Sequence, residues 1–192
     1  MKVIGFTGNY GAEGKDILQS YLMTDSSILF SGRPFFVPDF AHHFVARPSI
    51  VVRTGRLGKG IAPKFAHRYW DAFTAGFSVQ AIEDCDSRLG ALDRAFDGAA
   101  IVGDWVTTSS VDNALTTPVT LKVNGEVSAQ CCLADMCHPL DELLAAVSMR
   151  SSIKMGDFLF TGDAGPGHQL APGDRLTATI GGQEVLNVKV RL

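Results

Sequence analysis

Several kinds of sequence signal are missing from this chain of 192 residues. It has no run of about 18 apolar residues, so no segment has the length and apolarity of a membrane-spanning helix. Lys and Arg number 17 and are scattered along the chain, and the formal net charge is −3. Binding to nucleic-acid phosphates needs clustered cations. We therefore expect neither a membrane protein nor a nucleic-acid partner.

Signals for export and for disulfide bonds are also missing. The N-terminal segment Met1–Phe6 holds one Lys and a short apolar run, without the long apolar region of a signal peptide. The four cysteines form no Cys-x-x-Cys pair, and Cys131 and Cys132 are adjacent. Reduced thiols are typical of a cytosolic protein, so the expected location is cytoplasmic.

Common catalytic and cofactor-binding motifs are absent as well. The glycine-rich stretches Gly8–Gly14 and Thr161–His168 match neither the dinucleotide-binding nor the P-loop pattern, so we interpret both as turns. No G-x-S-x-G elbow and no His-x-x-x-His zinc motif occurs. The acidic run of Glu83, Asp84 and Asp86 offers oxygen ligands for a hard cation, although such a run is more often a solvated turn.

The composition is that of a folded domain. Apolar residues make up 46% of the chain and charged residues 19%, which excludes a disordered chain. The length suits one domain, expected over 1–192, which buries about 70% of the surface of its unfolded chain.

Short runs of alternating, β-branched and aromatic residues dominate the sequence. The pairs Asn124-Gly125 and Gly181-Gly182 predict two-residue hairpin turns, because a type I′ turn needs positive φ at both central positions. The runs predict strands at Val3–Phe6, Ser27–Phe30, Ser49–Thr54, Ala75–Ala81, Val119–Val123, Glu126–Cys132, Phe158–Thr161, Arg175–Ile180 and Glu184–Val190.

Helical patterns are fewer. Pro139–Met149 has Leu140, Leu143 and Leu144 at helical spacing, and proline suits the first helical turn. Ala62–Ala72 and Lys15–Leu22 are expected to form two further short helices. The fold class predicted from this pattern is mixed and mostly β, with a few short helices packed outside.

The second half of the chain carries an ordered series of short motifs. These are VNGEVSAQCCLADM (123–136), KMGDFLFTGDAGPG (154–167) and LAPGDRLTATIGG (170–182). With RAFDG (94–98) and NYGAEGKD (9–16), they resemble the fumarylacetoacetate hydrolase family. The resemblance implies a β-roll fold and a homodimer. It also implies hydrolysis, isomerisation or decarboxylation of 2-oxo and 2,4-dioxo acids.

Members of that family hold Mg²⁺, Mn²⁺ or Ca²⁺ on a Glu-x-Glu strand and one further Asp. A hard cation of this kind stabilises the enolate that develops on the substrate. The resemblance places the three ligand positions at Arg47, Ser49 and Ser78. Two hydroxyls and a guanidinium supply no anionic oxygen, so we expect no metal cofactor in this chain.

Other catalytic positions of the family have changed too. The resemblance places its His–Glu pair at Glu13 and Asp16 and its Lys at Arg94. The Thr of its TGTP loop is replaced by Asp163, next to Gly162. The candidate catalytic residues are therefore Glu13, Asp16 and Arg94. The candidate substrate-binding residues are Arg47, Ser49, Ser78, Gly162 and Asp163.

These replacements leave three functional hypotheses open. In the first, the protein has lost the metal chemistry and binds a small carboxylate or oxo acid through Arg47 and Arg94, which bind carboxylates bidentately. The same arginines could instead only neutralise local acids. In the second, it is an active hydrolase or isomerase that uses Glu13 and Asp16 for acid–base chemistry, with Arg94 stabilising an oxyanion. In the third, it is a structural module of a larger assembly.

Overall fold

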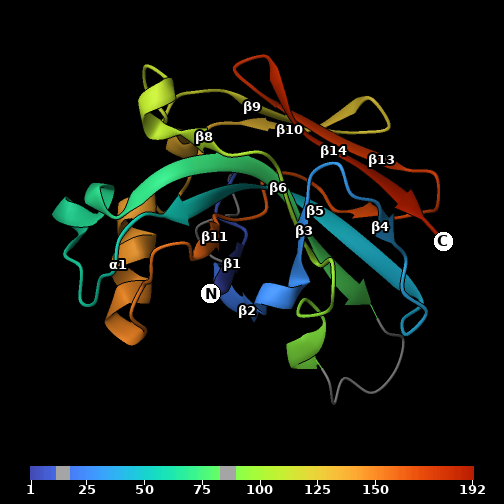
Figure 1. Cartoon of the computed structure of the whole chain (residues 1–192), viewed down its shortest axis with the longest axis horizontal. Helices are drawn as coiled ribbons and strands as arrows, with labels where there is room; N and C mark the ends of the chain where they lie inside the picture. The colour runs from blue at the N-terminus through green and yellow to red at the C-terminus, as the bar shows by residue number, and fades with distance from the viewer. Residues whose placement is uncertain (12–17, 83–89) are drawn as a thin grey trace.

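Two β-sheets pack on a shared core in the computed structural model, which describes residues 1–11, 18–82 and 90–192 (Figure 1). The strands of the larger sheet are β1 (Val3–Thr7), β2 (Gln19–Met23), β3 (Ile28–Phe30), β5 (His43–Thr54), β6 (Trp70–Ile82), β7 (Ala100–Val102), β8 (Val106–Thr107), β11 (Phe158–Phe160) and β12 (His168–Gln169). Their order is β2-β1-β11-β5-β6-β7-β3, with β12 paired to β5 and β8 paired to β6.

The smaller sheet has five strands. They are β4 (Phe35–Phe36), β9 (Val119–Val123), β10 (Glu126–Cys131), β13 (Arg175–Ile180) and β14 (Gln183–Arg191). Their order is β10-β9-β13-β14-β4, and both sheets mix parallel and antiparallel pairs. In Figure 1 this sheet lies across one side of the long β5–β6 ribbon. The predicted mixed, mostly-β class is confirmed.

The antiparallel pair β5–β6 forms the centre of the larger sheet, from the pair His43↔Ile82 to the pair Thr54↔Trp70. Both strands are longer than the predicted runs. For β5 the reason is that Pro48 interrupts the sequence pattern. Pro48 is tolerated since it falls between β12, which pairs at Val45–Ala46, and β11, which pairs at Val51–Arg53.

Both predicted hairpin turns are confirmed. Asn124 and Gly125 have φ values of 53° and 87° and join β9 to β10. Gly181 and Gly182 have φ values of 56° and 88° and join β13 to β14. These left-handed conformations match the twist of the flanking strands, which explains the Asn-Gly and Gly-Gly pairs.

The predicted helix at Pro139–Met149 is confirmed as α1 (Leu140–Arg150). Leu140, Leu143 and Leu144 are its buried leucines, and Asp141 and Glu142 occupy the first turn, where the helix dipole favours acids. Within the three described ranges, no helix is long and apolar enough to cross a membrane. Short 3₁₀ turns complete the helical content: η1 (Asp25–Ser27), η2 (Pro63–Arg68), η3 (Gly90–Leu92), η4 (Thr108–Ser110) and η5 (Leu133–Asp135).

Of the two other helix predictions, one is wrong and one is confirmed only in part. Of Lys15–Leu22, residues 15–17 lie outside the described part, and Gln19–Leu22 belongs to strand β2, which pairs with β1. Of Ala62–Ala72, Pro63–Arg68 forms the 3₁₀ turn η2, and the chain from Trp70 onward is strand β6. Pairing with a neighbouring strand outweighs weak local helical spacing in both segments.

A buried carboxylate ties the starts of β1 and β11 together. Asp157 is 1% exposed and accepts hydrogen bonds from the backbone N–H groups of Lys2 and Lys154, each at 2.8 Å. The ammonium Nζ of Lys2 lies 2.6 Å from its Oδ2. Burial by itself would raise the pKa of Asp157, but these hydrogen bonds outweigh it, so the pKa is lowered.

Replacing this carboxylate is expected to destabilise the fold and to change its acid sensitivity. The ionised form stabilises the native state above about pH 4, and that contribution disappears as the pH falls through the lowered pKa. Asp157→Asn should cost about 2 kcal/mol at pH 7, or roughly 4–8 °C in Tm. Thermal unfolding at pH 7 and pH 3 should show a difference that shrinks in acid. An equal loss at both pH values would contradict this assignment.

Candidate functional site

The register of β5 and β6 brings the predicted binding residues together. Arg47 is the direct cross-strand partner of Ser78, and Ser49 lies opposite Gly76. Because side chains alternate between the faces of a sheet, Arg47 and Ser49 share one face. Gln80, two residues beyond Ser78, belongs to the same face. Residues of β5 and β6 that are far apart in the sequence thus form one cluster.

Two arginines in this cluster converge on one neutral side chain. Arg94 donates from Nη1 to Ser78 Oγ at 3.0 Å and from Nη2 to Gln80 Oε1 at 2.9 Å. Arg47 donates from Nη1 to the same Gln80 oxygen at 3.0 Å. An amide oxygen accepts hydrogen bonds but carries no formal charge. Gln80 therefore holds two guanidinium groups close together without neutralising either.

Asp163 is the acidic member of the cluster. Its Oδ2 lies 3.9 Å from Nε of Arg47, and its Oδ1 is buried without a hydrogen-bond partner among the described residues. Burial raises the pKa of Asp163 by more than Arg94, Arg47 and the N–H of Gly8 lower it, so the pKa is raised. The carboxyl thus keeps its proton to a higher pH than a free Asp does, and the cluster retains a net positive charge.

A tight junction of two loops fixes the position of Asp163. The loop after β11 passes the loop after β1 at Gly162, whose φ is +142° and which has no room for a Cβ beside Gly8 and Asn9. Asn9 is buried, with φ at 75°, and donates from Nδ2 to the carbonyl of Thr161 at 2.7 Å. Its Oδ1 accepts from the N–H of His138 at 2.7 Å. Gly162 therefore acts through the backbone and holds Asp163 at the cluster.

Sequence reasoning missed Tyr21 and Gln80. The guanidinium of Arg94 lies 4.4 Å from the centre of the Tyr21 ring, a cation–π distance. The ring occupies the space above Gly5, its cross-strand partner, where any Cβ would collide with it. Burial raises the pKa of Tyr21 despite the opposing effect of Arg94 and a hydrogen bond to Ser78. Gln80 could have been found from its i+2 spacing to Ser78, but Tyr21 lies on a segment whose predicted helix is wrong.

The cluster borders a hollow of about 500 Å³. Gln80, Arg94 and Tyr21 belong to its wall, so these three members of the cluster are reachable from it. Its size falls within the range of small-ligand sites. The residues around it are Ile4, Ser20, Tyr21, Leu22, Gln80, Gly90, Ala91, Asp93 and Arg94.

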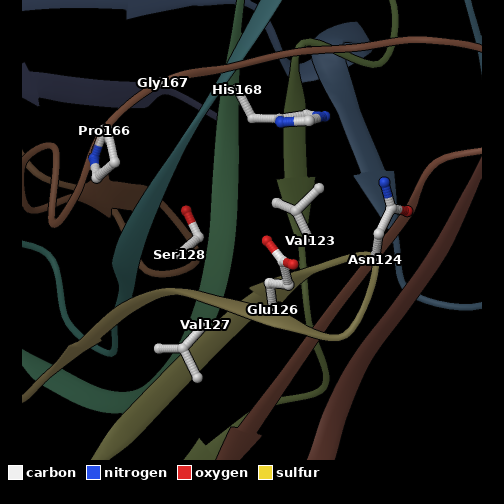
Figure 2. Close-up of a pocket in the computed structure, with 8 residues that line it drawn as sticks. All are labelled: Val123, Asn124, Glu126, Val127, Ser128, Pro166, Gly167 and His168. Atoms are coloured by element: carbon white, nitrogen blue, oxygen red, sulfur yellow. The ribbon is translucent and has the colours of Figure 1, made fainter.

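A second hollow, of about 220 Å³, is separate from the cluster. Figure 2 shows it between the β9–β10 hairpin and the loop that carries Pro166, Gly167 and His168. Nε2 of His168 lies 2.9 Å from Oδ2 of Asp174, so this ring nitrogen already has a polar partner. None of the predicted site residues that the structure describes lines this hollow. The residues around it are Val123, Asn124, Glu126, Val127, Ser128, Pro166, Gly167 and His168.

The remaining predicted residues cannot be placed. Glu13 and Asp16 lie outside the described residues, as does the acidic run of Glu83, Asp84 and Asp86. The structure therefore brings together Arg47, Ser78, Arg94 and Asp163. Ser49 is buried beside them on β5, and its Oγ donates to the carbonyl of Ile50 at 3.1 Å.

The divalent cation implied by the family resemblance does not fit these residues. In ranges 1–11, 18–82 and 90–192, no group of three or more His, Cys, Asp or Glu could hold a metal ion. The guanidinium of Arg47 occupies one expected ligand position, and a hard cation needs anionic or carbonyl oxygens instead. We therefore derive no chemical step through a metal at Arg47, Ser49 and Ser78.

Comparison with known proteins identifies relatives across most of the chain. A family model described as "Fumarylacetoacetate (FAA) hydrolase C-terminal" matches residues 11–191. An oxaloacetate tautomerase from Escherichia coli is 31% identical over 93 residues, which cover 48% of this chain and 42% of that protein. A mitochondrial oxaloacetate tautomerase from Caenorhabditis elegans is 22% identical over 147 residues, which cover 74% and 69% of the two chains.

Solved structures share the fold. A fumarylpyruvate hydrolase from Pseudomonas aeruginosa, solved with Mn²⁺ and pyruvate, superposes with a TM-score of 0.87 at 19% identity. The alignment covers 100% of this chain and 90% of that one. At this identity the likeness shows the fold alone.

Proposed function

The chain belongs to the fumarylacetoacetate hydrolase family, and on that premise we propose that it binds a small 2-oxo acid at Arg47 and Arg94 without a divalent cation. The relatives are an Mn²⁺-bound hydrolase and two oxaloacetate tautomerases, so hydrolase or isomerase chemistry is the family background. In this chain the guanidinium of Arg47 stands at one of the positions where that chemistry would need a carboxylate, and Arg94 lies beside it.

The observation that carries the proposal is the convergence of two guanidinium groups on the neutral Gln80. Opposite unit charges 4 Å apart attract by about 4 kcal/mol at an effective dielectric constant of about 20. A carboxylate that replaces Gln80 as the shared acceptor would gain such attraction from both arginines. Arg94 can bind it bidentately, because the guanidinium fork matches the spacing of carboxylate oxygens.

Three further parts of the proposal concern the metal-dependent activity, the oligomeric state and the location of the protein. Metal-dependent C–C bond hydrolysis is expected to be absent or very slow, because Arg47 and the two serines supply no ligands for the ion. A homodimer is supported by the family resemblance and by the exposed rings of Phe30, Phe36 and Phe40. A cytoplasmic location is supported by the free thiols among the described cysteines, Cys131, Cys132 and Cys137.

Loss of either arginine should weaken binding of a 2-oxo acid. Arg94→Gln and Arg47→Gln each remove charge-assisted hydrogen bonds worth about 1.5–3 kcal/mol, so the Kd for pyruvate or oxaloacetate should rise roughly ten- to hundredfold. Isothermal titration calorimetry in EDTA measures this. Arg56→Gln is the matched control, because Arg56 is exposed and its loss changes the net charge equally. Equal weakening by all three variants would contradict a specific site.

A second candidate function, metal-free keto–enol isomerisation, is favoured by Asp163. Its Oδ1 is buried and has no partner among the described residues, and its pKa is raised, as in many general bases. Asp163 would take a proton from the carbon next to the 2-oxo group, while Arg94 stabilises the enolate oxygen. Returning that proton to the oxygen completes the conversion to the enol. Glu13 and Asp16 remain alternative acids for the same step.

Asp163→Asn separates isomerisation from binding. If Asp163 moves the proton, kcat for oxaloacetate tautomerisation in EDTA should fall at least about a hundredfold, with KM nearly unchanged. The wild-type rate should rise with pH as the carboxyl ionises, with its midpoint above the usual pKa of Asp. Absorbance of the enol reports the rate. An unchanged kcat in the variant would exclude this role and leave the binding proposal intact.

A further inference from the structure

Positive side chains gather on the outer face of the smaller sheet, away from the site at Arg94. Arg175 on β13 and Lys189 on β14 are direct cross-strand partners. Arg191 lies two residues beyond Lys189 and so belongs to the same face of β14. Strand β14 ends near the C-terminus of the chain (Figure 1), and all three residues are exposed.

These cations surround a hollow of about 400 Å³. Arg33 adds a fourth cation from the loop between β3 and β4. None of the described residues in its wall is acidic, so these wall residues carry a formal charge of +4 in a chain whose net charge is −3. Its other wall residues are Gly32, Pro34 and Asn187.

Most of this charge is unpaired within the part of the chain that the structure describes. The side chains of Arg33, Lys189 and Arg191 form no ion pair or hydrogen bond with any described residue. Arg175 donates from Nε to Oδ1 of Asn187 at 2.9 Å, and its terminal nitrogens are free for a ligand. By contrast, Arg53 on the larger sheet forms a bidentate ion pair with Asp71, with N–O distances of 3.0 and 3.1 Å.

The like charges of Arg175 and Lys189 destabilise the smaller sheet when no anion is bound. Like charges directly opposite each other on neighbouring strands are destabilising, whereas opposite charges there stabilise a sheet. An anion between Arg175 and Lys189 would convert this repulsion into two attractive contacts. The carboxylate of Glu184 is linked to the cluster through Asn187, whose Nδ2 donates to its Oε1 at 3.1 Å.

We propose that this hollow binds a small anion with a di- or polyphosphate group. A single carboxylate would leave most of the +4 charge uncompensated, whereas a pyrophosphate group carries three to four negative charges and several oxygen acceptors. The guanidinium forks of Arg33, Arg175 and Arg191 suit phosphate oxygens, and Lys189 adds a point charge. No described residue belongs to the walls of both this hollow and the one at Arg94, so this site is separate from the oxo-acid site.

Inorganic pyrophosphate is the probe that tests the proposal. Calorimetry of the full chain at low ionic strength should show saturable binding of one pyrophosphate per chain. Raising the salt concentration should weaken the binding, and an excess of pyruvate should leave it unchanged. Lys189→Gln and Arg191→Gln should each weaken it at least tenfold, whereas Arg56→Gln removes an exposed charge elsewhere and should change it less than threefold.

Stability measurements show whether a weakened variant is still folded. Lys189→Gln removes the like-charge pair with Arg175, so its Tm without ligand should be equal to or above that of the wild type. Pyrophosphate should raise the Tm of the wild type and have less effect on the variant. Absence of saturable binding at millimolar pyrophosphate would overturn the proposal, and so would equal weakening by Arg56→Gln. Citrate binding as tight as pyrophosphate would overturn the assignment to phosphate.

Discussion

The shared hydrogen bonding of Arg47 and Arg94 to Gln80 is the interaction on which the functional account depends. Two guanidinium groups repel each other, and a neutral amide holds them together without removing that repulsion. The nearby carboxyl of Asp163 has a raised pKa and compensates the charge only in part. A site built in this way attracts an anion and repels a divalent cation. This is the opposite of what a carboxylate triad does at the same place in the fold.

The fold supplies this geometry through two backbone features, the register of two strands and the close contact of two loops. The β5–β6 register places Arg47 beside Ser78, and the spacing of two along β6 adds Gln80. The junction of Gly162 with Gly8 and Asn9 then brings Asp163 within reach of Arg47. These backbone features follow the motifs shared with the family, so the scaffold has kept its shape while the side chains at the metal-ligand positions have lost their negative charge.

Much of the fold could be predicted from the sequence, because its signals were local. The Asn124-Gly125 turn and the leucine spacing of α1 depend only on neighbouring residues. The strand at Gln19–Met23 was missed because it is defined by pairing with β1, which is a contact outside its own segment. In the same way, the ordered motifs indicated Arg47, Ser78, Arg94 and Asp163 as site residues. Tyr21 could not be recognised, because its role arises from a cross-strand contact rather than from a motif. The one signal for Gln80 was its i+2 spacing to Ser78.

Our central proposal is that positive side chains of this chain have taken the place of a metal ion in binding a 2-oxo acid. Calorimetric titration of the wild-type protein with pyruvate, once in EDTA and once in excess Mn²⁺, tests this claim most directly. We expect measurable affinity for pyruvate in EDTA and the same Kd for pyruvate, within twofold, when Mn²⁺ is present. Binding that requires Mn²⁺, with a stoichiometric ion on the protein, would contradict it.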